Sequence, residues 1–313
     1  MSGRGAEATG AGEGFAQATA ELLALLDLER IEEDLFRGRG SGGETSTRIF
    51  GGHVIAQALM AAYRTVEGRP CHSLHAYFIR PGDPSIPVVY QVDRARDGGS
   101  FTTRRVVAIQ HGRQIFNMGC SFHREEEGWH HQHPMPEAPP PETLPERAEL
   151  RARMVDRVPE KLRREWLRPR PIEIREIDPQ DWFSPRPLPD ANAMWFRVPG
   201  AEGAPQPLQH CLLAYASDLN LLGSALRPHG LSWFTGEVMT ASLDHAMWFH
   251  GPTDFSEWHL YAMDSPWAGG GRGLNRGLIY ARDGRLVASV AQEGLMRPRR
   301  PRPAGTDSEG GQR

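Results

Sequence analysis

Cysteine is scarce in this chain, and its three residues, Cys71, Cys120 and Cys211, lie far apart with no Cys-x-x-Cys spacing. Disulfide frameworks and zinc sites need paired or closely spaced ligands, so we expect neither a disulfide nor a metal. The three thiols are instead predicted to be reduced and mostly buried, as in a cytosol-like compartment.

Long apolar runs are also lacking. The longest, LLALLDL and VIAQALMAAY, fall short of the roughly 18 to 20 residues that span a bilayer, and the N-terminus has no basic then apolar secretory pattern. Neither sign of charge prevails, because 36 Lys and Arg residues face 39 Asp and Glu residues. We therefore expect a cytoplasmic protein with no membrane partner and no nucleic-acid partner attracted by bulk charge.

The chain has 313 residues, enough for one large domain or two of about 150 residues each. Residues 1–17 and 299–313 are rich in small, polar or Pro and Arg residues without apolar periodicity, which predicts two disordered tails. Residues 125–167 form a Pro-rich and then highly charged connector that ends in a helical stretch. This leaves two folded units, residues 18–124 and residues 168–298.

The two units repeat one pattern of elements. Each has an apolar helix, then a strand (SLHAYFIRPGD or TASLDHAMWFHGP), then two strands joined by HG or DG, which is typical of a β-hairpin. An offset of about 172 sets Gly112 against Gly284, and an offset of about 170 sets His75 against His245. We predict an α+β unit of about 110 residues that is present twice.

Small residues on the first helix indicate what this unit is, since a helix rich in Gly and Ala allows a sheet to wrap closely around it. The strings FGGHVIAQAL, HAYFIRPGD, RDGGSFTTRRVVAIQHG, LAYASDLNLL, LDHAMWFH and VASVAQEGLMR occur in this order. In this respect the chain resembles the bacterial type II acyl-CoA thioesterases and their peroxisomal relatives. The resemblance implies a double hotdog, an acyl-CoA substrate, a homo-oligomer and no cofactor.

Asp218 is the most informative polar residue. On a helix its neighbours one turn away are Ala214, Tyr215, Leu221 and Leu222, so its carboxylate projects from an apolar face. A carboxylate in such a place must be hydrogen-bonded, be protonated or face a ligand cavity. A structural acid that caps a neighbouring segment explains the pattern equally well, whereas in the resembling family the matching Asp is catalytic.

Two further residues complete the set that the resemblance implies. Gln292 shares the core-facing side of its strand with Ala288 and Val290, and its counterpart in the first unit is Cys120, so folding of the unit does not require an amide there. Ser242 opens the strand-like SLDHAMWFH, where strand alternation sets it opposite Leu243. A satisfied core glutamine and an ordinary edge serine are the alternatives.

Five residues are candidates for contacts with the substrate or its oxyanion. The backbone N–H groups at Gly51 and Gly52 begin a helix and suit an oxyanion. His53 stands where the family more often has Gln, and a surface or cap histidine is its default interpretation. Arg272 and Arg276 carry charge that suits the phosphates of CoA.

The function that follows is hydrolysis of fatty acyl-CoA to free acid and CoA, with Asp218 as the base. The nearest alternative is a hotdog hydratase, although such enzymes pair Asp with a His that this sequence lacks beside Asp218. The second is a non-catalytic acyl-CoA-binding protein, against which the complete set of Asp218, Ser242 and Gln292 argues.

Overall fold

The structure, a computed structural model, describes residues 4–41 and 47–299. Within these residues one antiparallel sheet has thirteen strands in the order β1-β2-β4-β5-β6-β3-β10-β13-β12-β11-β8-β7, with β9 beside β13. The strands of the first half are β1 (Glu29–Glu32), β2 (Leu35–Gly38), β3 (Cys71–Phe78), β4 (Val88–Asp97), β5 (Phe101–Gln110) and β6 (Arg113–His123). Those of the second half are β7 (Glu173–Glu176), β8 (Asn192–Arg197), β9 (Val238–Ser242), β10 (Asp244–Phe249), β11 (His259–Gly269), β12 (Arg272–Ala281) and β13 (Leu286–Pro298).

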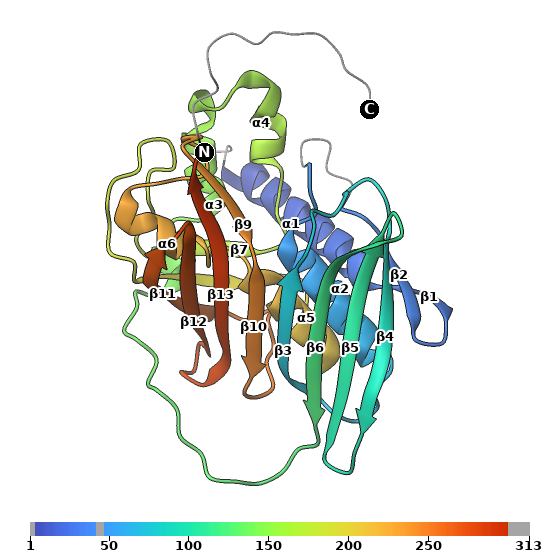
Figure 1. Ribbon diagram of the computed structural model, residues 1–313. Coiled ribbons are helices and arrows are strands. Elements are labelled where there is room, and N and C mark those ends of the chain that lie inside the picture. The colour runs from blue at the N-terminus through green and yellow to red at the C-terminus, as the bar shows by residue number, and fades with distance from the viewer. Residues whose placement is uncertain (1–3, 42–46, 300–313) are drawn as a thin grey trace, which may run out of the picture.

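The two halves meet along β3 and β10, and the strand order is nearly the same in both directions from this seam. Two apolar helices, α2 (Gly51–Tyr63) and α5 (Gln206–Ser217), contact each other on the inner side of the sheet. Figure 1 shows this pair behind the central strands. The expected α+β architecture of two fused units, each a sheet around one helix, is therefore confirmed.

The remaining helices lie between these elements or before them in the chain. They are α1 (Arg4–Leu26), η1 (Pro141–Thr143), α3 (Arg147–Arg153), η2 (Val155–Arg157), α4 (Glu160–Leu167), α6 (Gly223–Leu226) and η3 (Arg227–His229). None of the helices in the described residues is long and apolar enough to cross a membrane. All three cysteines are buried, as predicted.

The predicted hairpins are confirmed in both halves. β5 pairs with β6 and β12 pairs with β13, and the turn glycines Gly112 and Gly284 have φ angles of 67° and 92°. These positive angles explain the glycines, because other residues adopt them only at a cost. Residues of the two hairpins that are 172 positions apart also share the inward face of the sheet, since Cys120 and Gln292 are both buried.

The alignment of His75 with His245 is wrong by one residue. The inward-facing residues of β3 include Leu74 and Ala76, whereas those of β10 are His245 and Met247. His75 is exposed and His245 is fully buried. In a strand a shift of one residue turns a side chain to the opposite face, so the two histidines have different environments.

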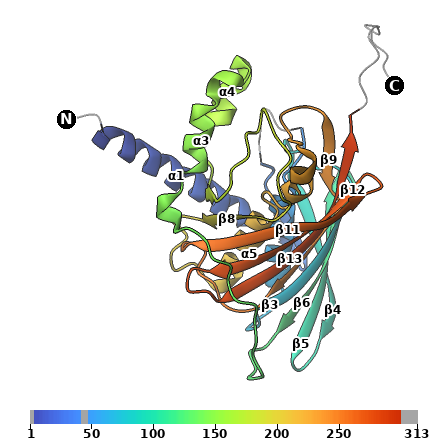
Figure 2. The same cartoon turned by 90° about the vertical axis from the view of Figure 1, so that its left-hand side faces the viewer.

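The predicted disorder of residues 1–17 is also wrong from Arg4 onward, because α1 begins there. Residues 4–26 contain no proline and seven alanines, which favour a helix, although four glycines in the first half of α1 disfavour it. Its C-terminal part is held by burial of Ala18, Leu22 and Leu26. Figure 2 shows α1, α3 and α4 on the side of the molecule away from β4 to β6. The predicted C-terminal tail lies outside the described residues except for residue 299.

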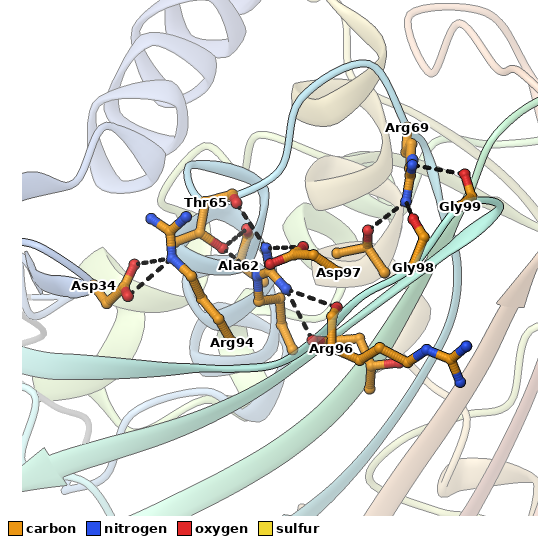
Figure 3. A network of polar contacts seen from close by, with 12 residues as sticks. Asp34, Ala62, Thr65, Arg69, Arg94, Arg96, Asp97, Gly98 and Gly99 are labelled. Carbon is orange, nitrogen blue, oxygen red and sulfur yellow. Dashed lines mark hydrogen bonds and ion pairs between the residues drawn. The ribbon is translucent and has the colours of Figure 1, made fainter.

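A buried arginine links the C-terminal end of α2 to the β4–β5 hairpin through hydrogen bonds and an ion pair. Arg104, which is 1% exposed, donates to the hydroxyl and carbonyl oxygens of Thr65 and forms an ion pair with Asp97 at 2.7 Å. Figure 3 shows this network beside Arg69, which donates to the Gly98 carbonyl. These contacts orient α2, whose opposite end begins at the candidate site.

Candidate active site

Asp218 lies where helix α5 ends. The helix stops at Ser217 and Asp218 is its C-cap, so the expected continuation through Leu222 is wrong. The surroundings are nevertheless apolar as predicted, because Ala214 and Leu221 are fully buried. The carboxylate therefore leaves the helix end among hydrophobic side chains, where it needs hydrogen-bond donors.

Three donors from distant parts of the chain meet at this carboxylate. Gln292 Nε2 donates to Asp218 Oδ1 at 2.6 Å, and Ser242 Oγ donates to the same oxygen at 3.4 Å. The backbone N–H of Gly52 donates to Oδ2 at 2.9 Å. The structure thus brings together the three residues predicted to act together, and adds the Gly52 N–H at the start of α2 as a third donor to the carboxylate.

Burial sets the electrostatics of Asp218. Removal from water raises the pKa of its carboxyl from 3.8 to about 6, although the hydrogen bonds from Gln292, Gly52 and Ser242 act in the opposite direction. No arginine or lysine contributes to this shift. A carboxylate with a pKa near neutrality is well matched to accepting a proton at physiological pH.

Gln292 is oriented by His245, which was not among the candidate site residues. Its Nε2 also lies 3.1 Å from His245 Nδ1, while His245 Nε2 lies 2.9 Å from the hydroxyl of Ser217. Since Nε2 of an amide only donates, His245 Nδ1 accepts, and the imidazole proton is assigned to Nε2. Burial lowers the pKa of His245 to about 3, which keeps the ring neutral. The signal in the sequence was the alternation that sets His245 on one face with Met247 and Phe249.

A break between two strands aims Ser242 at Asp218. Ser242 is the last residue of β9 rather than the first of β10, which begins at Asp244. Both strands pair with β13, and the intervening Leu243 donates its N–H to the Glu293 carbonyl at 2.9 Å. Because the strand is interrupted after Ser242, the direction of this side chain does not follow the simple alternation of faces expected from Ser242 and Leu243.

Close approach explains the two glycines that begin α2. A Cβ on Gly51 would lie 2.6 Å from Asp218 Oδ2, and a Cβ on Gly52 would overlap the carbonyl oxygen of Tyr215. Because Asp218 already engages the Gly52 N–H, the expectation that this group serves an oxyanion is corrected. The N–H of Gly51 is the first of the helix and has no acceptor within it.

A cavity of about 560 Å³ opens on the carboxylate. Asp218, Ser242 and Gly51 line it together with apolar side chains, and Gln292, which is 1% exposed, contacts the Asp218 carboxylate. The other lining residues are mainly hydrophobic and include Ile49, Phe50, Val54, Phe78, Ile115, Phe116, Leu222 and Trp233.

The predicted arginine contacts do not lie at this cavity. Arg272 is paired with Glu293 at 2.8 Å and Arg276 with Asp264 at 2.7 Å, and neither lines the cavity. The cations that do are Arg48, which donates to the Thr240 carbonyl, and Arg80. Neither was a candidate in the sequence, although Arg48 stands three residues before Gly51 and Arg80 directly follows the strand HAYFI.

His53 is buried, and its default interpretation as a surface or cap residue is wrong. It is 2% exposed, its Nε2 has no hydrogen-bond partner, and burial lowers its pKa to about 4. It lines a second cavity rather than the one at Asp218, because α2 directs successive residues to different sides.

Comparisons with known proteins place this geometry in a family. Residues 179–295 match the family described as acyl-CoA thioesterase, and residues 41–123 match that described as acyl-CoA thioesterase N-terminal domain. Acyl-CoA thioesterase 2 of Haemophilus influenzae is 39% identical over 277 residues, which cover 88% of this chain and 96% of the relative.

Solved structures agree with this similarity. An acyl-CoA thioesterase II from Mycobacterium marinum, TesB2, superposes with a TM-score of 0.72 at 42% identity and covers 92% of this chain and 99% of its own. A conserved protein with a hot dog fold from Alicyclobacillus acidocaldarius has a TM-score of 0.70 at 20% identity over 88% of this chain and 97% of its own. The second likeness concerns the fold alone, and it confirms the predicted hotdog architecture.

Proposed function

We propose that this chain, which belongs to the acyl-CoA thioesterase family, hydrolyses fatty acyl-CoA to free acid and CoA with Asp218 as the general base. The observation that carries this proposal is the buried Asp218 carboxylate, with its pKa raised to about 6, on the wall of a largely apolar cavity. The same carboxylate is contacted by Gln292 and Ser242, which supply the remaining polar groups.

The proposed reaction begins with a water placed between Asp218 and the thioester carbonyl. Asp218 accepts one proton from this water while its oxygen attacks the carbonyl carbon. Gln292 and Ser242 hold the water, and Gln292 has an acceptor oxygen, Oε1, without a protein partner that suits this task. The Gly51 N–H stabilises the oxyanion. The carbon–sulfur bond then breaks, and the proton on Asp218 passes to the CoA sulfur.

This mechanism requires no covalent acyl-enzyme. The reaction requires a positioned water, one base and donors for the oxyanion. Asp218 and the groups around it can hold the water, act as the base and donate to the oxyanion. Location in the cytoplasm and a homo-oligomeric state remain predictions that accompany this function.

Release of free thiol from a panel of saturated and 2-enoyl acyl-CoAs tests the proposal. We expect thiol to appear, measured with a thiol reagent, in proportion to enzyme and substrate. A hydratase would consume the 2-enoyl substrates without releasing thiol, and a binding protein would retain acyl-CoA without changing it. Either of these two results contradicts the proposed function.

A further inference from the structure

A second and larger cavity of about 920 Å³ adjoins the candidate active site. Its walls come from α1, α3, the segment after α4 and β7, together with the start of α2 and the end of α5. Much of the lining is apolar and includes Phe15, Leu22, Leu25, Ile172 and Leu219. Three of these residues come from the N-terminal helix, which the sequence did not predict.

One aromatic pair separates the two cavities. Phe50, the N-cap of α2, lines both of them, and its ring meets that of Tyr215 edge to face at a centroid distance of 5.2 Å. Tyr215 lines only the second cavity. The wall therefore consists of one residue from each half of the chain, at the contact between α2 and α5.

The backbone around the wall brings the two rings and the carboxylate together. A Cβ on Gly52 would lie 2.6 Å from the Phe50 ring and would overlap the Tyr215 carbonyl, so glycine permits this approach. At the end of α5, Asp218 faces the first cavity and the next residue, Leu219, faces the second. The wall thus stands within one helical turn of the proposed base.

Several charged side chains also line the second cavity, and among them the buried Nε of Arg151 has no hydrogen-bond partner in the described part of the chain. Arg147 pairs with Glu176, and both Arg168 and Arg170 pair with Glu165. Charged groups also lie near the wall, because burial raises the pKa of the Tyr215 hydroxyl while Arg170 and Arg168 oppose this shift. Phe15, Leu22 and Leu25 of α1 and Leu219 after α5 supply apolar lining as well. An alkyl chain that enters past Phe50 meets hydrophobic side chains there, and their burial favours its binding.

We infer that the Phe50–Tyr215 pair limits the length of the acyl chain, and that the second cavity receives the distal part of a long chain when the wall opens. This inference rests on the proposed thioesterase function. In the closed arrangement that the structure holds, the acyl chain is confined to the 560 Å³ cavity. A long chain must displace the Phe50 ring, which opposes its binding.

The test compares kcat/KM for hexanoyl-CoA and palmitoyl-CoA in Phe50→Ala and in the wild type. Joining the cavities is expected to raise the ratio of palmitoyl to hexanoyl kcat/KM by at least about tenfold, since a single methylene in an apolar pocket contributes roughly 10- to 200-fold. Tyr215→Ala opens the same wall from α5 and must shift the ratio in the same direction. Thermal unfolding of each variant verifies that it is folded.

Two further variants make the test specific. Phe101→Ala removes a phenylalanine that lies on β5 outside both cavities and must leave the ratio at the wild-type value. Leu25→Trp, added to Phe50→Ala, narrows the apolar part of the second cavity next to α1 and must return the ratio toward the wild-type value.

The outcomes separate the inference from the function on which it rests. If the wild type releases thiol but Phe50→Ala and Tyr215→Ala keep its ratio, the wall does not set chain length and the inference is wrong. If the double variant keeps the raised ratio, the chain does not enter the second cavity. If the wild type hydrolyses no acyl-CoA of any length, the proposed function itself fails.

Discussion

Gln292 on β13 donates to the carboxylate of Asp218 at 2.6 Å, although 74 residues separate the two in the chain. The same amide nitrogen lies 3.1 Å from His245 on β10. Because an amide nitrogen has two hydrogens, both contacts are satisfied at once, and the orientation of the amide is fixed. The unpartnered Oε1 is thereby fixed as well, which is the arrangement that the proposed water requires.

Replacement of Asp218 by Asn should lower kcat by about 10²- to 10⁴-fold, the usual contribution of a positioned base. The substitution keeps the size of the side chain but removes its capacity to accept a proton. Steady-state thiol release measures kcat, and binding of a non-hydrolysable acyl-CoA thioether measures the retained affinity. Asp264→Asn, which breaks the surface pair with Arg276, is the matched control. Activity above a tenth of the wild-type value would remove Asp218 from the role of base.

The pH profile of kcat/KM should report the raised pKa of Asp218. A base acts only when it is deprotonated, so activity is full above the pKa of about 6 and falls about tenfold per pH unit below it. His245, with its pKa lowered to about 3, does not titrate in this interval. A midpoint near the ordinary value of 3.8 would show that burial does not govern the reacting group.

His245→Leu should reduce kcat with little change in KM, because His245 acts by positioning Gln292. Loss of the acceptor at Nδ1 frees the amide to rotate away from Asp218. The hydrogen bond from Gln292 lowers the pKa of Asp218, so its loss must move the midpoint of the pH profile upward. A merely structural histidine would leave that midpoint unchanged. His75→Leu, at the exposed histidine on β3, serves as the matched control.

Gly52→Ala should destabilise the protein by about 1 to 3 kcal/mol, the usual cost of overpacking. The added methyl group meets the backbone carbonyl of Tyr215, which cannot move as a flexible side chain would. Chemical denaturation measures the loss, and kcat should fall as well because the Gly52 N–H contact to Asp218 is disturbed. Gly119→Ala, where no atom lies within 4 Å of the added Cβ, is the control and should be close to neutral. Equal stability of the two variants would contradict the close packing of α2 on α5.

Arg104→Ala should lower the free energy of unfolding by about 3 kcal/mol or more, because it leaves buried partners without a donor. The network lies at the end of α2 opposite Gly52, so kcat/KM of the folded enzyme should change little. Arg105→Ala removes the neighbouring exposed arginine and should stay within about 0.5 kcal/mol of the wild type. A similar loss of unfolding free energy in both variants would mean that the buried network stabilises the protein no more than an exposed arginine does.

The sequence by itself determined the local features and their faces. Hydrophobic alternation set Gln292 on the inward side of its strand, helical spacing surrounded Asp218 with apolar residues, and the two HG and DG turns predicted the hairpins. Each of these depends on a period of 2 or 3.6 residues, or on a turn that needs glycine, and such patterns are properties of neighbouring residues.

Only the tertiary structure decided which of these faces meet. In the structure α5 ends at Ser217, and β9 ends at Ser242. His245 is buried, whereas His75 is not. The Gly52 N–H donates to the Asp218 carboxylate, 166 residues away in the chain. The tertiary structure also built the wall between the two cavities from one residue of each half. The physical reason is that periodicity fixes the direction of a side chain along its own element, whereas its partners depend on register and packing between elements, where a shift of one residue exchanges buried for exposed.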